Sequence, residues 1–339
     1  GSWNNNGNGR SLILNGHVDV VPTGPQENWS GSPWSGSINK DRIYGRGACD
    51  MKAGLISGIY ALKILIESGF KPNGNVQIQS VVGEESGGCG TLTNIVKGYT
   101  ADGAIILEPT SLSICPIQSG ALTFRIIING RATHAATRWE GISAIEKFEL
   151  VHQAILGLEK DRHKSFQIKY YENPNRVAPI NIGTIHSGDW HSTVPEKLTA
   201  EGRFGVFPGE SAQEARTSLE NTIKKIATED PWLKNSPPVL KWINGQYESG
   251  KTPMEHPLVK TLTSCHESVS NKRAKLEGVT YGSDLRLFTN HAKIPAVLYG
   301  PGDVRLAHSA NEYVEIRDVM RSVEVIANFI VQWCGGQFK

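Results

Sequence analysis

Three short apolar runs alternate with longer segments in the first third of the chain. The runs Leu12–Leu14, Val76–Val82 and Ala104–Leu107 have the composition of buried strands, whereas Gly54–Ser68 has that of a helix and Asn94–Gly98 that of a short helix. Strands that alternate with helices favour βαβ units, which build a mainly parallel sheet with helices on its faces. The carboxyl ends of parallel strands meet at one edge, where ligands bind. We therefore predict an α/β domain whose functional residues follow these runs.

Side chains that bind metals follow all three runs. His17 and Asp19 close the first run, Glu84 and Glu85 follow the second, and Glu108 follows the third. Residues two apart on a strand point to the same side, so Asp19 is well placed to accept the second ring N–H of a metal-bound His17. Adjacent side chains diverge, so one glutamate of the pair can bind metal while the other faces an attacking water. Each of these residues alone is also an ordinary polar residue for a strand end.

Two further residues extend this set. Asp50 stands in the glycine-bracketed loop Gly45–Gly54 that leads into the predicted helix, where it can either cap the helix or bridge two metals. His308 follows the turn-rich segment Gly300–Asp303. Two imidazoles with several carboxylates form the ligand inventory of a two-metal site, and such a site indicates metal-assisted hydrolysis.

The second part of the chain has a different character. Strand-like and helix-like segments follow one another there in the order of a compact α+β (ferredoxin-like) insert. They are the strands Leu122–Asn129, Asn181–Ile185, Lys197–Phe207 and Val239–Ile243 and the helices Gly141–Lys160 and Ser211–Thr228. After Gly245 the α/β character returns with a helix at Pro257–Val269, a strand at Ala296–Tyr299 and a helix at Arg317–Trp333. We predict a catalytic domain formed by residues 1–118 and 247–339, with an inserted domain at 119–246.

Bulk properties exclude several function classes. The formal net charge is +2 and no basic block is interleaved with aromatics, which argues against nucleic acid as a partner. No apolar stretch approaches the roughly 20 residues of a membrane span. Five scattered cysteines without a Cys-x-x-Cys pattern argue against a disulfide framework and a thiolate zinc site, so we expect a cytoplasmic location. The asparagine- and glycine-rich residues 1–9 predict a loop.

Six segments occur in the order found in the M20 metallopeptidase/deacylase family, and the chain resembles most the branch of acetylornithine deacetylase and succinyl-diaminopimelate desuccinylase. The resemblance extends from Ser11 to about Trp333. The segments are His17–Asp19, Gly45–Lys52, Glu84–Gly88, Glu108–Thr110, Gly130–Ala135 and Gly300–His308.

The resemblance implies a set of metal ligands. His17 and Glu108 would hold one Zn²⁺, Glu85 and His308 would hold the other, and Asp50 would bridge the two, with Co²⁺ or Mn²⁺ as possible substitutes. It also implies a di-zinc catalytic domain and an inserted domain that forms a homodimer and acts as a lid.

The resemblance implies catalytic roles as well. Glu84 would be the general base and Asp19 would orient His17. Because family members often have a cis peptide after the bridging aspartate, the bond between Asp50 and Met51 is a candidate cis bond. His134 of the inserted domain would reach the partner subunit's active site and help to stabilise the tetrahedral intermediate.

Substrate-binding residues are harder to assign. Arg286, in the segment Tyr281–Arg286, resembles the family segment that reaches a substrate carboxylate, although a surface or helix-start arginine would look the same. Ser192 stands where several relatives have an asparagine, which separates this chain from the desuccinylase pattern. Family members also usually carry several dozen residues before the His-x-Asp strand, so we expect either a truncated chain or a short catalytic domain with exposed apolar sheet surface.

These observations favour a hydrolase of a small N-acyl amino acid or N-acyl amine, similar to acetylornithine deacetylase. An aminoacylase, an aminopeptidase or carboxypeptidase acting on dipeptides, and an N-formyl-aminopyrimidine deformylase are alternatives with the same metals and base. A non-catalytic binding or dimerisation module is an alternative from another class. A two-metal phosphoesterase fits the ligand chemistry, but the chain has no phosphate-binding cluster.

Overall fold

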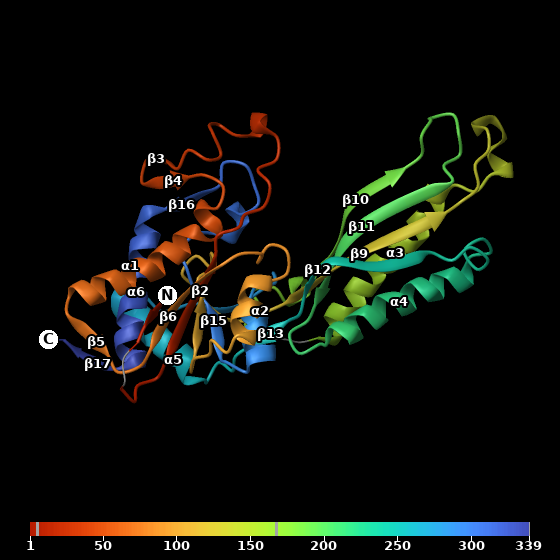
Figure 1. The fold of residues 1–339 in the computed structure, drawn as a ribbon. Coiled ribbons are helices and arrows are strands. Elements are labelled where there is room, and N and C mark those ends of the chain that lie inside the picture. The colour runs from red at the N-terminus through yellow and green to blue at the C-terminus, as the bar shows by residue number, and fades with distance from the viewer. Residues whose placement is uncertain (5–6, 167–168, 339) are drawn as a thin grey trace. The chain divides into compact units, whose positions relative to one another are not determined.

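A computed structural model describes residues 1–4, 7–166 and 169–338 of this chain, which divides into two compact units (Figure 1). Unit 1 comprises Gly1–Gln118, Gly250–Gly278 and Ser283–Lys339. Unit 2 comprises Ser119–Ser249 and Val279–Gly282. Each unit is built around its own sheet.

The sheet of unit 1 has eight strands in the order β1-β6-β2-β7-β15-β8-β13, with β14 paired to β8. Its centre is parallel, because β2 pairs in parallel with β6 and β7, and β7 with β15, whereas β1, β8 and β13 are antiparallel to their neighbours. The predicted α/β class with a mainly parallel central sheet is thus confirmed. The strands are β1 (Ser2–Trp3), β2 (Leu12–His17), β6 (Val76–Val81), β7 (Ala104–Ile106), β8 (Ile114–Gln118), β13 (Gly250–Lys251), β14 (Leu276–Val279) and β15 (Ala296–Leu298).

Helices cover both faces of this sheet. Leu14 of β2 contacts the helix α1 (Ala53–Glu67) at Gly58, whereas the next residue, Asn15, donates to Thr91 of α2 (Cys89–Val96). Since successive side chains of a strand point to opposite faces, α1 and α2 lie on opposite sides. The helices α5 (Pro257–Ser270) and α6 (Ile316–Cys334) complete the layer of α1, because α6 packs against both α1 and α5.

Smaller elements complete unit 1, and the sequence did not predict them. A three-stranded sheet joins β3 (Ser37–Asn39), β4 (Arg42–Tyr44) and β16 (Tyr313–Glu315), and β5 (Phe70–Pro72) pairs with β17 (Gly336–Phe338). Short helical turns are η1 (Gln26–Asn28), η2 (Ala48–Lys52), η5 (Leu287–Ala292) and η6 (Val304–Leu306), and unit 2 has η3 (Ala135–Glu140) and η4 (Pro174–Arg176).

Two local predictions were wrong. The helix expected at Asn94–Gly98 instead spans Cys89–Val96. Gly88 takes a left-handed conformation (φ 78°) at its start, which lets the helix begin directly after the loop that carries Glu84 and Glu85 (residues 82–87, the glutamate loop). The N-terminal segment predicted as a loop contains β1, whose Ser2 and Trp3 pair with β6; residues 5–6 of that segment lie outside the described residues.

Unit 2 is an α+β layer structure. Its antiparallel sheet has the order β10-β11-β9-β12, and the helices α3 and α4 pack against it. The bounds are β9 (Gly120–Asn129), α3 (Ala144–Ser165), β10 (Ile180–Ser187), β11 (Lys197–Val206), α4 (Ala212–Glu229) and β12 (Val239–Tyr247).

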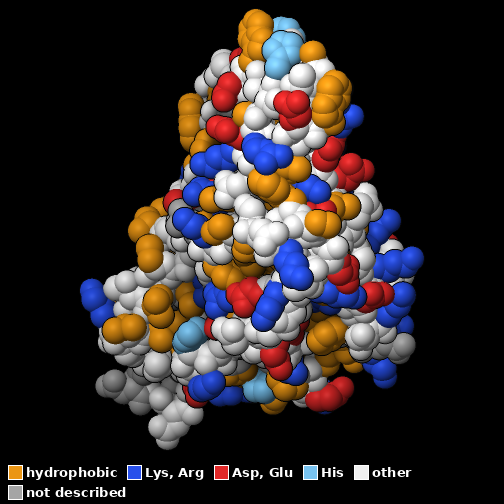
Figure 2. All heavy atoms as spheres, turned by 90° about the vertical axis from the view of Figure 1, so that its right-hand side faces the viewer, with side chains coloured by type: hydrophobic (Ala, Val, Ile, Leu, Met, Phe, Trp, Pro, Cys, Tyr) orange, Lys and Arg blue, Asp and Glu red, His pale blue; other side chains and the backbone are white. Residues whose placement is uncertain are grey.

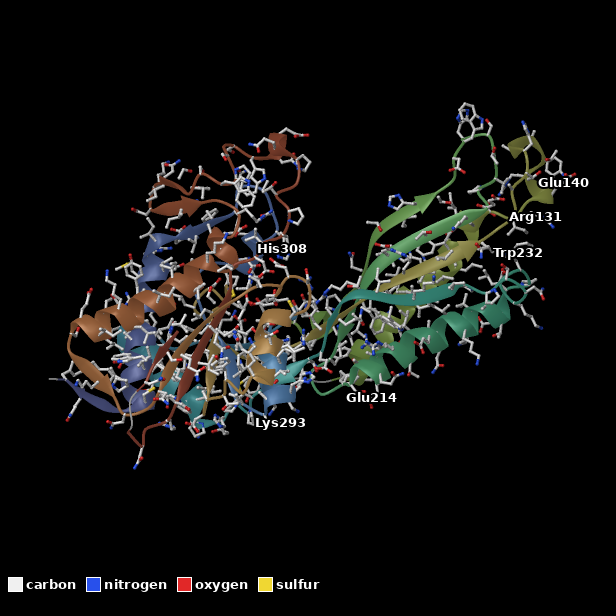
Figure 3. The ribbon with its side chains drawn as sticks, in the orientation of Figure 1. Arg131, Glu140, Glu214, Trp232, Lys293 and His308 are labelled. Carbon is white, nitrogen blue, oxygen red and sulfur yellow. The ribbon has the colours of Figure 1, made fainter. Side chains whose placement is uncertain are left out.

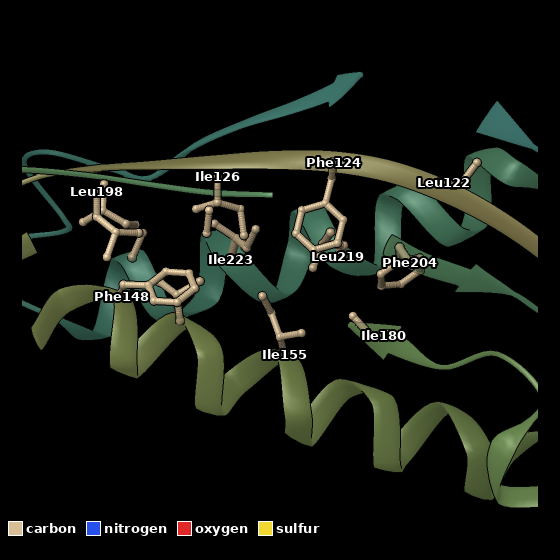
Figure 4. Close-up of a cluster of buried hydrophobic side chains, with 14 of the residues drawn as sticks. Leu122, Phe124, Ile126, Phe148, Ile155, Ile180, Leu198, Phe204, Leu219 and Ile223 are labelled. Atoms are coloured by element: carbon tan, nitrogen blue, oxygen red, sulfur yellow. The ribbon is translucent and has the colours of Figure 1, made fainter. Parts of the chain in front are cut away.

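One hydrophobic cluster holds the two layers of unit 2 together (Figure 4). Along β9, Leu122, Phe124, Ile126 and Ile128 are fully buried and alternate with half-buried residues. This period of two directs one face of the strand toward the helices, which contribute apolar residues such as Leu219. Non-polar burial on this face is therefore the main stabilising contact between sheet and helices.

The surface carries both signs of charge. Figure 2 shows Lys and Arg side chains intermixed with Asp and Glu over the face it displays. Within the described part of the chain, no helix has both the length and the apolar composition that crossing a bilayer requires.

Truncating Phe124 tests the core of unit 2. We expect Phe124→Ala to lower the free energy of unfolding by about 3–5 kcal/mol, because it removes buried surface and leaves a cavity between sheet and helices. Urea denaturation followed by circular dichroism measures the change. Ile185→Ala on β10, where the side chain is 51% exposed, is the matched control and should change stability by less than about 1 kcal/mol. Equal losses in both variants would contradict the proposed core.

Candidate dinuclear metal centre

The parallel strands of unit 1 place several acidic residues and an imidazole at one edge. His17 is the last residue of β2 and lies opposite Val81 at the end of β6, so Glu84 and Glu85 follow closely beyond the neighbouring strand. Glu108 follows β7, on the other side of β2. The strand-end prediction from the sequence therefore has a direct geometric basis in the parallel register.

Asp50 connects this edge to His308. Its Oδ1 lies 3.2 Å from Nε2 of His17, and its Oδ2 lies 3.3 Å from Nε2 of His308, which stands on the loop before β16 (Figure 3). The turn that carries Asp50 begins at Gly47, whose left-handed φ of 82° favours glycine. The peptide bond between Asp50 and Met51 is cis, as the resemblance implied. Each carboxylate oxygen of Asp50 thus faces a different imidazole.

Two groups of metal-binding side chains share this aspartate. One contains His17, Asp50 and Glu108 and the other contains Asp50, Glu85 and His308, and within each group one ligand atom per residue lies within 4.8 Å of the others. Imidazole nitrogen and carboxylate oxygen are the ligands of catalytic zinc and of related divalent metals. The donor set therefore fits two divalent cations that share a bridging carboxylate.

Charge pairing shifts the pKa values of these ligands. Burial lowers the pKa of His17, but the hydrogen bond with Asp50 and the charges of Glu108 and Glu84 outweigh it and raise the pKa to about 11. Hydrogen bonds with Asp50 and Glu85 raise the pKa of His308 to about 10. Burial opposes ionisation of Asp50, yet the two imidazoles lower its pKa to about 2. In the metal-free protein, imidazolium ions thus neutralise part of the carboxylate charge.

The remaining carboxylates are crowded and buried. Burial raises the pKa of Glu84 well above its ordinary value, and the charges of Glu108 and Asp284 add to this effect. Burial and the charge of Asp50 raise the pKa of Glu108 to about 8. Glu84 belongs to neither ligand group among the described residues, although its Oε2 lies 4.0 Å from Nε2 of His17. A buried carboxylate with a raised pKa beside metal ligands is suited to accept and return a proton.

Asp19 has two separate contacts. Its main-chain carbonyl accepts from Nδ1 of His17 (2.8 Å), whereas its carboxylate lies 3.6 Å from that nitrogen. The carboxylate instead accepts the backbone N–H groups of Glu84 (3.4 Å) and Glu85 (3.2 Å). Asp19 therefore links the His17 strand end to the glutamate loop.

A buried polar chain that the sequence analysis missed lies on the α2 face of the sheet. Asn15 donates to Thr91 Oγ1 (2.9 Å) and to Gln79 Oε1 (3.3 Å), and Thr91 donates to Asp284 Oδ2 (2.5 Å). Burial raises the pKa of Asp284, which is fully enclosed. An asparagine inside an otherwise apolar strand was the available signal, because a buried polar side chain requires partners.

The predicted substrate-binding residues belong to different units. Arg286 belongs to unit 1, is 4% exposed, and donates through Nη2 to the carbonyl oxygen of Gly87 in the glutamate loop (2.9 Å). Ser192 and His134 belong to unit 2, where the carbonyl of Ser192 accepts from the N–H of Ala135 (2.9 Å). His134 is exposed, and its Nδ1 accepts from the N–H of Ala136. The metal ligands all belong to unit 1.

Comparison with known proteins identifies the family. Residues 13–332 match peptidase family M20/M25/M40. The chain belongs to this family. Its members are metal-dependent hydrolases of amide bonds, which is the reaction class that the two ligand groups indicate.

Individual relatives differ in the acyl group that they remove. The N-formyl-4-amino-5-aminomethyl-2-methylpyrimidine deformylase of Bacillus subtilis is 32% identical, over 96% of this chain and 79% of the relative. The acetylornithine deacetylase of Myxococcus xanthus is 26% identical, over 98% of this chain and 82% of the relative. An M20 family metallo-carboxypeptidase from Sulfolobus solfataricus shares the fold, with a TM-score of 0.78, 19% identity, and coverage of 97% of this chain and 86% of that one.

Metal binding should release protons. At pH 7.5 both imidazoles of the metal-free centre are protonated, since their pKa values are raised to about 11 and about 10. Each must lose its proton to bind a cation, and Glu108, whose pKa is raised to about 8, is also largely protonated at this pH. We therefore expect between about two and three protons to be released and the apparent affinity to increase with pH. Calorimetric Zn²⁺ titrations in buffers of different ionisation enthalpy count these protons. Release of no protons at pH 7.5 would contradict the charge pairing described here.

Proposed function

We propose that this protein hydrolyses the amide bond of a small N-acyl amine, with Glu84 as the general base. The observation that carries the proposal is that Asp50 belongs to both ligand groups, while the buried Glu84, which belongs to neither, lies 4.0 Å from the ligand His17. Two Zn²⁺ ions bound there, or Co²⁺ or Mn²⁺ in their place, would lower the pKa of a water and polarise the scissile carbonyl. The five free cysteines fit the cytoplasmic location predicted from the sequence.

The chain's own residues have distinct roles in this proposal. His17 and Glu108 would hold one cation, Glu85 and His308 would hold the other, and Asp50 would be shared by both. Glu84 accepts the proton of the attacking water and then donates it to the departing amine. Its raised pKa supports both steps, because such a carboxylate binds a proton more readily than an exposed one. Asp19 orients His17 through its carbonyl oxygen and positions the backbone of Glu84 and Glu85 through its carboxylate.

Among the acyl groups, we propose formyl or acetyl rather than succinyl. Arg286, which the sequence suggested as the partner of a substrate carboxylate, is almost fully buried and donates a hydrogen bond to the carbonyl oxygen of Gly87. Ser192 replaces the asparagine of several relatives, and its hydroxyl offers fewer hydrogen bonds than an amide. The higher identity to the pyrimidine deformylase supports an N-formyl amine as the first substrate to test.

A small substrate panel tests this proposal. The zinc-loaded protein is incubated with N-formyl-4-amino-5-aminomethyl-2-methylpyrimidine, N-acetylornithine, N-succinyl-diaminopimelate and a dipeptide, and amine release is followed. We expect turnover of the formyl or acetyl compound, with the succinyl compound and the dipeptide slower. No turnover of any member by protein that holds two metals would favour the non-catalytic binding module.

Replacement of Glu84 tests the base. We expect Glu84→Gln to lower kcat by about 10²–10⁴-fold, because the amide cannot accept the proton of water. Metal content, measured by mass spectrometry, should remain that of the wild type. Glu255→Gln, at an exposed carboxylate, is the matched control and should keep full activity. Wild-type kcat in Glu84→Gln would rule out this glutamate as the base.

We also propose a homodimer through unit 2, in which His134 donates to the developing oxyanion in the partner's site. His134→Ala should lower kcat by about 10²–10³-fold, as the loss of one oxyanion donor does. Mixing His134→Ala with Glu84→Ala subunits creates heterodimers with one intact site, so about a quarter of wild-type activity should return after random exchange. Activity that stays at the level of the separate variants would exclude a donor from the partner.

A further inference from the structure

We propose that Arg46 and Glu312 form a positioning pair that fixes the bridging carboxylate and thereby the spacing of the two metal positions. This inference rests on the proposed function in that it assumes metals at the two ligand groups. Neither residue belongs to those groups among the described residues. Both side chains are buried, Glu312 at 1% and Arg46 at 5% exposure.

Glu312 holds the backbone of the turn that carries Asp50. Its Oε1 accepts two consecutive N–H groups, from Cys49 (2.8 Å) and from Asp50 itself (3.0 Å). Its carbonyl oxygen accepts the N–H of Gly45 at the start of the same segment (3.0 Å). Because Glu312 is four residues after His308, these bonds couple the turn of the bridging aspartate to the loop of a ligand in the second group.

Arg46 extends this connection to the third ligand segment. Its Nη1 donates to Oε2 of Glu312 and to the carbonyl oxygen of Ser309 (3.2 Å), next to His308. Its Nη2 donates to the carbonyl oxygen of Pro22 (3.3 Å), in the segment that follows His17 and Asp19. One guanidinium therefore ties together the chain segments that carry His17, Asp50 and His308, and its rigid planar shape fixes their relative directions.

The energetics favour a positioning role over a stabilising one. Removing two opposite charges from water costs much of what their attraction returns, so a buried ion pair is a weak source of net stability. The same buried pair is strongly directional, since its hydrogen bonds define where the N–H groups of the turn must lie. Removing a residue that hydrogen-bonds to a metal ligand, without itself binding the metal, typically lowers metal affinity by about 10–100-fold. Glu312 is such a residue for Asp50, because it accepts the Asp50 N–H, and Arg46 in turn donates to Glu312.

Unit 2 contains a matched control pair. Arg162 and Glu210 are each 7% exposed in their side chains and form a buried ion pair. Arg162 also donates to a carbonyl oxygen, that of Gly205 (3.0 Å), and Glu210 accepts a backbone N–H, that of Phe207 (2.8 Å). Each arginine also lies over an aromatic ring. The two pairs differ mainly in that only one of them contacts metal-ligand segments.

The experiment compares Glu312→Gln, Arg46→Lys and Glu210→Gln in the full chain. Each protein is stripped of metal and titrated with Co²⁺, and binding is followed by visible absorption and by calorimetry, with thermal unfolding of the metal-free forms measured in parallel. We expect Glu312→Gln to bind Co²⁺ about 10–100-fold more weakly and with an altered spectrum. Arg46→Lys keeps the charge and should lose less affinity, and it tests the pair if Glu312→Gln does not fold. Glu210→Gln should lower the unfolding temperature but keep wild-type affinity and spectrum.

Three results would overturn the proposal. Wild-type affinity and spectrum in both Glu312→Gln and Arg46→Lys would show that the pair does not position Asp50. An equal loss of affinity in Glu210→Gln would show a general effect of destabilisation. A wild-type protein that takes up no Co²⁺ would overturn the pair and the proposed function together. By contrast, two bound metals, weaker binding in Glu312→Gln and no turnover of the substrate panel would support the pair and reject only the proposed function.

Discussion

The concentration of negative charge at one edge of the parallel sheet is the constraint on which the rest of the structure depends. Glu84, Glu108 and Asp50 are enclosed near one another, and isolated carboxylates in such a place would not stay ionised. In the metal-free chain, His17 and His308 supply the compensating positive charge. Divalent cations supply more charge to the same oxygens, which is why this arrangement suits a dinuclear metal site.

The backbone makes this concentration of charge possible. Parallel pairing of β2 with β6 and β7 brings the ends of three strands to one edge of the sheet. Gly47, in the left-handed conformation, begins the turn that carries Asp50 to this edge. Glu312 accepts backbone N–H groups of that turn, and Arg46 donates to a backbone carbonyl of the segment that follows His17. Main-chain hydrogen bonds to Glu312 and Arg46 therefore help to define where the turn of the bridging aspartate lies.

Much of the fold followed from local pattern, and its failures have physical causes. The runs at Leu12, Val76 and Ala104 became β2, β6 and β7, since a buried parallel strand needs a continuous apolar run. The strand β16 was not predicted because its pairing with β4 joins segments some 270 residues apart, as in the contact of Arg42 with Glu315. The strands β3 and β4 pair locally, but each has three residues and no buried side chain, so neither gives an apolar run in the sequence. The helix α2 was misplaced because its start depends on the conformation of Gly88, which apolar periodicity does not report.

The sequence by itself determined the α/β class, the family and the candidate ligands, because these depend on residue type and order along the chain. It did not determine that Glu312, Arg46, Thr91 and Asp284 surround the centre, since their contacts join distant segments through buried hydrogen bonds. It also assigned Asp19 one contact with His17, whereas the structure divides its role between a carbonyl and a carboxylate. Only the tertiary structure decided these points. A buried polar side chain cannot hydrogen-bond to water, so its role depends on which residues from distant parts of the chain lie close enough to pair with it.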